Sequence, residues 1–381
     1  MPQRWRRFSE EEQNDEVIII CSDERTRGED KMNKTAKKLR IAFFDAKDYD
    51  RNSFLEANAS EEFEITYLDA RLSTDTCKLA EGYDAVCVFV NDEVNAEVID
   101  RLASMGVRLI ALRCAGYNNV DIEYAYGKIH VVRVPAYSPY AVAEHAMALL
   151  LTSIRRIHKA YIRTRDFNFS LNGLTGFDLH GKTVGVIGTG KIGRIFIDIC
   201  RGFGMHVIAY DKFPAANSDI EYVGLDELWE RSDIISLHCP LTDENRHMIG
   251  ADTIARMKKG VVIINTSRGA LIDSEALLEG IKQRQVGAAC LDVYEEEADV
   301  FFHDYSGHIV NDDTLARLIS MPNVIVTSHQ AFLTKEALAN IADTTLDNVR
   351  LFFENDTCPN EICYKCANLS TCKQTHEKKC F

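Results

Sequence analysis

Three apolar runs in the second half of the chain each precede a side chain suited to acid–base or anion chemistry. Arg268 follows VVIINT with one serine between them, the glutamates at 295–297 follow AACLDVY, and His329 follows NVIVTS. Short apolar runs of this kind are typical of buried parallel strands. In an open parallel sheet, ligands bind at the carboxyl ends of the strands. We therefore expect a cation, a carboxylate and an imidazole to meet at one edge of one sheet.

The chemistry of these three groups is complementary. The planar guanidinium of Arg268 can bind a carboxylate through two parallel hydrogen bonds and polarise an adjacent keto oxygen. Imidazoles are common proton donors and acceptors in catalysis, so His329 can give a proton to that oxygen or remove it in the reverse direction. A carboxylate beside the ring would fix its orientation. The residue pattern leaves open which of the three glutamates takes that place.

A glycine-rich segment, VGVIGTGKIG, indicates a dinucleotide site. Gly188, Gly190 and Gly193 have the spacing G-x-G-x-x-G between an apolar run and a helical pattern. This context predicts a tight turn, close approach of the backbone to a pyrophosphate, and a helix N-terminus that faces the phosphates. Asp211 ends the next apolar run, 23 residues after Gly188. A carboxylate there binds the ribose 2′-hydroxyl, which favours NAD over NADP.

The chain alternates short apolar runs with amphipathic segments, which predicts an α/β fold with two doubly wound parallel sheets, of the flavodoxin or Rossmann type. The site is expected in the cleft between the two domains. A helix begins near Pro139, and residues 141–151 are apolar on almost all sides, which predicts burial on more than one side. The predicted divisions are an extension without a fold at 1–39, a substrate domain at 40–136 and 331–358, an NAD-binding domain at 137–330, and a cysteine-rich tail at 359–381.

Composition limits the class of protein. The 381 residues are 46% apolar and 27% charged, with a net charge of −14. This balance argues against a surface for nucleic acid or anionic membranes, and no apolar run is long enough to span a bilayer. Seven of the twelve cysteines lie in apolar or helical contexts, as expected for reduced thiols of a cytoplasmic protein.

The other five cysteines crowd the last 24 residues. There, Cys363, Cys366, Cys372, His376 and Cys380 could hold zinc, although their spacing matches no standard finger. Reversible oxidation and a passive tail remain open alternatives. We expect no metal ion in the reaction itself.

Longer motifs are similar to those of a known family. IGTGKIG, HCPLT, NTSRGALIDS, LDVYEEE and HQAF resemble the D-isomer-specific 2-hydroxyacid dehydrogenases. More closely, ALRCAGYNNVD, VPAYSP, TRDFNFSLNGLTGFDLHGKT, VFFHDYSG and TCPNE resemble the fermentative D-lactate dehydrogenases of that family. The similarity extends from about Lys38 to about Glu361. It implies an enzyme that reduces pyruvate to D-lactate with NADH, reversibly.

The resemblance also implies the role of each reacting residue. Arg268 would bind the substrate carboxylate, and His329 would be the acid/base. Glu297 would be the partner of His329, because it matches the second acidic position of the family's DVYExE run. None of these three departs from the family pattern.

The remaining site residues are likewise implied by the resemblance. The backbone of Ala115 and Gly116 would hold the substrate carboxylate from the first domain, and Tyr137 and Phe332 would wall a pocket with room for little more than a methyl group. Asp292 would contact the nicotinamide carboxamide. The full set expected to bind NAD is Gly188, Thr189, Gly190, Lys191, Ile192, Gly193, Asp211, His238, Cys239, Pro240, Thr266, Ser267 and Asp292.

Expectations about partners follow from the same family. The helix that starts near Pro139 would form a homodimer or a higher homo-oligomer. Two functional alternatives stay open: a dehydrogenase for another D-2-hydroxy acid, and an NAD-sensing protein that resembles the co-repressors of the family and binds peptides.

Overall fold

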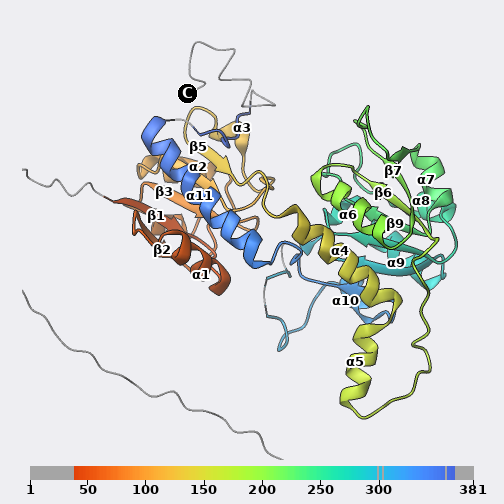
Figure 1. The fold of residues 1–381 in the computed structure, drawn as a ribbon. Coiled ribbons are helices and arrows are strands. Elements are labelled where there is room, and N and C mark those ends of the chain that lie inside the picture. Colours follow the sequence, from red (N-terminus) through yellow and green to blue (C-terminus); the bar gives the residue numbers. More distant parts are fainter. Residues whose placement is uncertain (1–37, 298–299, 303, 357, 365–381) are drawn as a thin grey trace, which may run out of the picture. The chain divides into compact units, whose positions relative to one another are not determined.

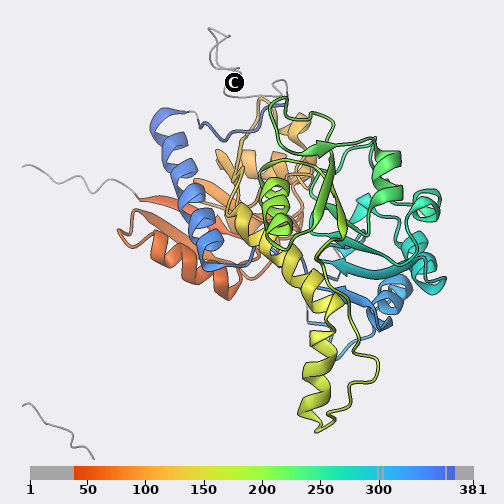
Figure 2. The same cartoon turned by 45° about the vertical axis from the view of Figure 1, so that its right-hand side comes forward.

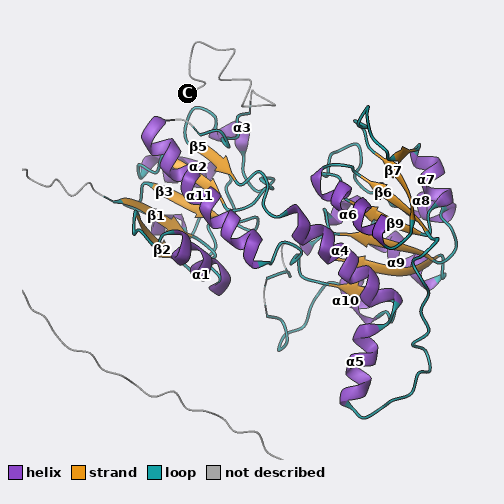
Figure 3. Cartoon of the chain, viewed as in Figure 1, coloured by secondary structure: helices purple, strands orange, loops and turns teal. Residues whose placement is uncertain are grey.

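The structure is a computed structural model that describes residues 38–297, 300–302, 304–356 and 358–364. Within these residues the chain forms two parallel sheets with helices packed on their faces (Figures 1 and 3). The predicted α/β class is confirmed. No helix of the described segments is long and apolar enough to cross a membrane.

The first sheet has five strands in the order β2-β1-β3-β4-β5. Its strands are β1 (Leu39–Phe43), β2 (Phe63–Tyr67), β3 (Ala85–Val88), β4 (Leu109–Leu112) and β5 (His130–Arg133). The elements that connect them are α1 (Asp48–Ala57), the 3-10 helix η1 (Cys77–Ala80), α2 (Ala96–Ser104) and α3 (Ile122–Ala125). Every residue of β3 and β4 is buried, which explains why these strands are apolar without alternation.

A late helix completes this first half. The helix α11 (Lys335–Asn355) is capped by Thr334, whose hydroxyl accepts from the Ala337 N–H. Its buried face, which includes Phe352, belongs to the same apolar core as the first sheet. The chain then runs along β5, where the Ile362 N–H donates to the Val131 carbonyl at 2.8 Å. The chain therefore returns to the first sheet after it has built the second.

The second sheet has seven strands in the order β12-β11-β10-β9-β6-β7-β8. They are β6 (Thr183–Ile187), β7 (His206–Tyr210), β8 (Glu221–Tyr222), β9 (Ile234–Leu237), β10 (Val261–Asn265), β11 (Val286–Leu291) and β12 (Val324–Val326). The helices around them are α6 (Lys191–Gly202), α7 (Leu225–Arg231), α8 (Ala251–Arg256), the 3-10 helix η2 (Gly269–Leu271), α9 (Ser274–Lys282) and α10 (Asp313–Ser320). The strand order reverses between β6 and β9, and ligands bind at such a switch point in doubly wound folds.

Two consecutive helices follow the first sheet. The helix α4 (Pro139–Ile154) begins where predicted, with the Ser138 hydroxyl as its cap, and nine of its residues are buried. It ends before Arg156, which adopts a left-handed conformation with φ 55°. The next helix, α5 (Ile157–Arg165), has no buried residue and projects beyond the second sheet in both views (Figures 1 and 2). The change of direction at Arg156 separates the buried helix α4 from the exposed helix α5.

Candidate active site

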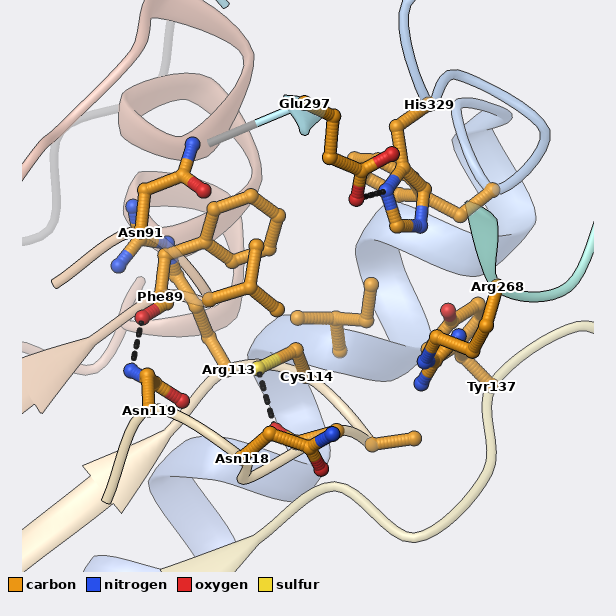
Figure 4. Close-up of a pocket in the computed structure, with 15 residues that line it drawn as sticks. Phe89, Asn91, Arg113, Cys114, Asn118, Asn119, Tyr137, Arg268, Glu297 and His329 are labelled. Carbon is orange, nitrogen blue, oxygen red and sulfur yellow. Dashed lines mark hydrogen bonds and ion pairs between the residues drawn. The ribbon is translucent and has the colours of Figure 1, made fainter. Parts of the chain in front are cut away.

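His329 and Glu297 form a close pair. His329 lies three residues beyond β12 and has φ 53°, a left-handed conformation that turns the chain away from the strand. Its Nδ1 is 2.8 Å from Oε1 of Glu297, and the other carboxylate oxygen accepts from the Tyr294 N–H at 3.1 Å. Figure 4 shows the ring and the carboxylate facing one another. The pair leaves Nε2 of the imidazole available for a proton transfer.

The neighbouring glutamate has a different partner. Oε1 of Glu295 lies 2.6 Å from Nε2 of His247 and 2.7 Å from Nη2 of Arg246. Glu297 is therefore the glutamate that contacts His329, as the family resemblance implied. The residue pattern alone could not make this choice.

Arg268 reaches the same place from β10. Its carbonyl accepts from Nδ2 of Asn265 at 2.8 Å, which fixes the turn after the strand. The turn packs closely against Tyr294, because a Cβ on Gly269 would lie 2.0 Å from the Tyr294 carbonyl carbon. Nη2 of Arg268 is 3.0 Å from the point where Gly116 would carry a Cβ. A glycine at 116 therefore lets the guanidinium lie directly over the backbone that follows β4.

One pocket gathers all the residues predicted to be catalytic or to bind substrate. Its walls include Ala115, Gly116, Tyr137, Arg268, Glu297, His329 and Phe332 (Figure 4). Two of these make an apolar wall: the rings of Tyr137 and Phe332 have centroids 6.2 Å apart. Burial raises the pKa of the Tyr137 phenol to about 12, so this side of the pocket is uncharged at neutral pH.

The pocket also has walls that sequence reasoning did not identify. They include Phe89, Asn91, Asn118 and Asn119, at the carboxyl ends of strands in the first sheet. Phe89 packs against Phe332, and the buried guanidinium of Arg113 lies between the rings of Phe89 and Phe43. Ligands gather at strand ends in both sheets, but amides and aromatic rings there carry no charge that would mark them as site residues.

A second pocket adjoins the first. It contains nine of the predicted cofactor residues: Gly190, Lys191, Ile192, His238, Cys239, Pro240, Thr266, Ser267 and Asp292. Five residues line both pockets: Ala115, Tyr137, Arg268, His329 and Phe332. Groups bound in the two pockets would therefore lie side by side, with these five residues in reach of both.

The glycine loop has the predicted form. Gly188 directly follows β6 and has φ 95°, and a Cβ there would lie 2.7 Å from the backbone of His238. A Cβ on Gly193 would lie 2.0 Å from the Gly188 carbonyl oxygen, so only glycine lets α6 begin this close to the loop. A Cβ on Gly190 would meet nothing within 4 Å. The space beside Gly190 is thus open on the side where a pyrophosphate would approach.

Asp211 lies across the loop at the end of β7. Its Oδ2 accepts from the Thr189 N–H at 2.6 Å and from the Thr189 hydroxyl at 3.0 Å. Its Oδ1 accepts from the Phe213 N–H at 2.8 Å. Burial raises the pKa of the Asp211 carboxyl, but these hydrogen bonds outweigh it and the pKa is lowered overall. The carboxylate is charged at neutral pH and already fixed to the glycine loop.

The pocket residues fit a dinucleotide. The Thr266 hydroxyl is buried in the pocket wall and has no hydrogen-bond partner among the described residues. His238 lines the same pocket, with its Nε2 2.9 Å from the Ser236 hydroxyl oxygen, and burial lowers the pKa of its imidazole to about 4. A neutral ring, an unpaired hydroxyl and the N-terminus of α6 suit a ligand that carries amide, ribose and phosphate groups.

Asp292 is already hydrogen-bonded within the protein. Asp292 lines the second pocket, but it is fully buried and both carboxylate oxygens accept from the chain's own N–H and O–H groups. Its expected contact with a nicotinamide stays a prediction.

In the cysteine-rich tail, Cys363 is buried. Residues 365–381, with the other proposed zinc ligands, lie outside the described residues.

Comparisons with known proteins agree with this geometry. Residues 147–331 match the model of the D-isomer specific 2-hydroxyacid dehydrogenase, NAD binding domain. The chain is 50% identical to a D-lactate dehydrogenase of Escherichia coli over 85% of its own length and 100% of that protein. The structure is similar to the apo-structure of the E. coli enzyme, with a TM-score of 0.78 at 49% identity, over 85% of this chain and 100% of that one. It is also similar to the pyruvate reductase of Chlamydomonas reinhardtii, with a TM-score of 0.81 at 43% identity, over 85% and 98%. The chain belongs to the D-isomer-specific 2-hydroxyacid dehydrogenases and contains the NAD-binding domain of that family.

Proposed function

We propose that the protein is an NAD-dependent D-lactate dehydrogenase, which reduces pyruvate to D-lactate with NADH and catalyses the reverse reaction. One observation carries this proposal: Arg268 and the His329–Glu297 pair line a single small pocket that shares five residues with the cofactor pocket. Two of the similar proteins are a D-lactate dehydrogenase and a pyruvate reductase, which supports the choice of substrate.

Each reacting residue then has one task. The Arg268 guanidinium binds the pyruvate carboxylate through two hydrogen bonds, and the N–H groups after β4, at Ala115 and Gly116, hold that carboxylate from the other side. When bound, NADH supplies a hydride to the keto carbon. His329 gives the proton that turns the keto oxygen into a hydroxyl, and it takes the proton back in the reverse direction. Glu297 holds the ring by Nδ1 and stabilises the imidazolium.

The cofactor-binding residues are assigned in the same way. The loop from Gly188 to Gly193 and the start of α6 hold the pyrophosphate, and Asp211 binds the ribose hydroxyls and excludes a 2′-phosphate. The strand-end residues His238, Thr266 and Asp292, with those beside them in the second pocket, surround the nicotinamide end. The unpaired Thr266 hydroxyl supports this placement.

The chain divides into domains at the two places where it passes between the sheets. Residues 40–136 and 331–358 form the substrate domain, and residues 137–330 form the NAD-binding domain. The separate apolar cores of the two sheets support this division.

The protein acts as a homodimer or a higher homo-oligomer. Seven large apolar side chains are exposed on α5 and the segment after it: Ile157, Tyr161, Ile162, Phe167, Phe169, Leu171 and Phe177. A surface of this kind supports burial against a second copy of the chain.

We place the protein in the cytoplasm, because buried thiols such as Cys87, Cys200 and Cys290 suit a reducing compartment.

Steady-state NADH oxidation with four 2-keto acids tests this function. Pyruvate, 2-ketobutyrate, phenylpyruvate and hydroxypyruvate are compared by kcat/KM, and the chirality of the product is determined by chromatography. We expect pyruvate to be preferred over phenylpyruvate by about 100-fold, because the pocket walled by Tyr137 and Phe332 is expected to have room for little more than a methyl group. The product should be D-lactate. Preference for phenylpyruvate would point to another D-2-hydroxy acid, and absence of turnover with all four acids would contradict the enzyme assignment.

A further inference from the structure

The segment that carries His329 is fixed by one buried carboxylate. Asp292 follows β11 directly and is fully buried. Its Oδ1 accepts from the Thr327 hydroxyl at 2.6 Å and from the Gln330 N–H at 2.9 Å. Its Oδ2 accepts from the Ala331 N–H at 2.9 Å. In addition, the Asp292 carbonyl accepts from the His329 N–H at 2.7 Å. Four hydrogen bonds therefore hold the residues on both sides of the imidazole.

The backbone at His329 needs this support. A non-glycine residue with φ 53° lies in a region that L-residues occupy at a cost, and such residues persist where surrounding contacts hold them. The direction of the imidazole toward Glu297 depends on that conformation. Loosening the bonds to Asp292 would let the segment relax and would turn the ring away from its carboxylate partner.

A histidine from another element completes the set of donors. His145 lies on α4, and its Nε2 is 3.3 Å from Oδ1 of Asp292 and 3.2 Å from the Thr327 hydroxyl oxygen. The Thr327 hydroxyl gives its single proton to Asp292, so its oxygen can accept from the imidazole. A buried carboxylate is costly unless donors surround it, and His145 provides the side-chain N–H from α4. Burial raises the pKa of the Asp292 carboxyl, but the hydrogen bonds of His145, Thr327 and Ala331 outweigh it and lower the pKa overall.

We propose that His145 is a positioning residue for His329. It acts through Asp292 and Thr327, and it connects α4 to the segment that carries the acid/base. The catalytic part of this inference rests on the proposed function, in which His329 transfers the proton. The structural part does not: it states that a donor at the Nε2 position of residue 145 keeps residues 327–331 in place.

Two matched variants separate hydrogen bonding from packing. His145→Gln places an amide N–H near the position of Nε2, whereas His145→Asn carries the same amide one methylene shorter and cannot reach Asp292. His145→Leu removes the donor and serves as a second test if the asparagine variant folds poorly. The full-length variants are compared with the wild type by hydrogen–deuterium exchange of peptides that span residues 327–332, and by kcat with pyruvate and the Kd for NADH.

We expect the asparagine and leucine variants to exchange about 10-fold faster at residues 329–331, because they lose a hydrogen bond to a charged group. Peptides from β6 and β7 should exchange at the wild-type rate. The kcat of these variants should fall about 10-fold or more, since a small misplacement of a reacting group is enough for that loss. The glutamine variant should stay within about threefold of the wild type in both measurements, and the Kd for NADH should hardly change.

Two outcomes would overturn the inference: wild-type exchange and kcat in the asparagine and leucine variants, or equal impairment of the glutamine and asparagine variants. The second outcome would mean that the imidazole only fills space. Failure of the proposed function would look different. In that case the wild-type protein would not turn over any of the four keto acids, while the exchange comparison would still decide whether His145 holds the segment.

Discussion

At the residue scale, Arg268 has donors to spare for a ligand. Within the protein, Nη1 donates to the Ser267 carbonyl, and Nη2 lies over the backbone at Gly116. Asn265 fixes the turn rather than the guanidinium itself. The fork therefore keeps the two parallel N–H groups that a carboxylate needs.

Arg268→Lys should raise the KM for pyruvate by about 10- to 100-fold. A point charge replaces a planar fork, so one hydrogen bond to a charged group is lost. Steady-state kinetics with saturating NADH measure this change. Arg246→Lys is the matched control, because Arg246 is exposed and pairs with Glu295 outside both pockets. An unchanged KM in the Arg268 variant would remove the residue from substrate binding.

His238 gives the protein a predictable response to acid. Burial lowers the pKa of its imidazole to about 4 in the folded protein, from 6.5. Between these two values the unfolded chain binds more protons than the folded one, so stability falls as the pH falls through this window. The expected loss between pH 7.5 and pH 5 is about 2 kcal/mol from this residue.

Urea unfolding of the wild type and His238→Gln at pH 7.5 and pH 5 measures this contribution. The wild type should lose about 2 kcal/mol more than the variant over this range, because glutamine does not titrate. Other titrating groups act equally in both proteins and cancel in the comparison. Equal losses in the two proteins would show that His238 is protonated without cost in the folded state.

The sequence allowed the charged site residues to be predicted, but not their surroundings. Arg268 and His329 stood out because a charged side chain and an imidazole each come just after an apolar run. Asn91 and Phe89 did not stand out, because amides and aromatic rings are common at strand ends for other reasons. The link between Asp292 and His145 joins residues 147 positions apart, and only the fold shows that they are neighbours.

At the element scale, the glycine loop shows how two glycines can serve different ends. Gly193 is needed for packing, because α6 passes close to the Gly188 carbonyl. A Cβ on Gly190 would meet no atom of the protein within 4 Å, so a glycine at this position is required only for the close approach of a ligand. The two positions therefore separate folding from cofactor binding within one loop.

Gly190→Ala should weaken NADH binding by about 10-fold or more while changing the stability of the cofactor-free protein by less than about 1 kcal/mol. Gly193→Ala should lower that stability by about 1–3 kcal/mol, because the new methyl group forces α6 away from β6. Fluorescence titration with NADH and urea unfolding measure the two effects. Wild-type NADH affinity in the Gly190 variant would place the pyrophosphate elsewhere.

The strands and their order of appearance were largely predictable, because each apolar run is short and bounded by polar residues. The strand β8 was not predicted, since its two residues, one of them half-buried, carry no pattern. The end of α4 at Ile154 was not predicted either. Arg156 turns the chain with φ 55° without a glycine or proline to mark the break.

At the scale of the whole molecule, function depends on residues from both sheets meeting in one pocket. Ala115 and Gly116 follow β4 of the first sheet, and Arg268 and Glu297 follow strands of the second. All four line the same pocket as His329. Neither sheet holds a complete site. The doubly wound fold was predictable from alternating runs. The exposure of α5 was not, because only the fold shows that no residue of this helix is buried.

The most direct test of the account is the turnover of His329→Gln. Glutamine can still form a hydrogen bond but cannot transfer a proton, so kcat with pyruvate should fall by about 100- to 10,000-fold while the Kd for NADH stays near that of the wild type. His206→Gln, which changes an exposed histidine on β7, is the control and should retain full activity. Wild-type turnover in the His329 variant would contradict the account, because proton transfer would then have to come from another group.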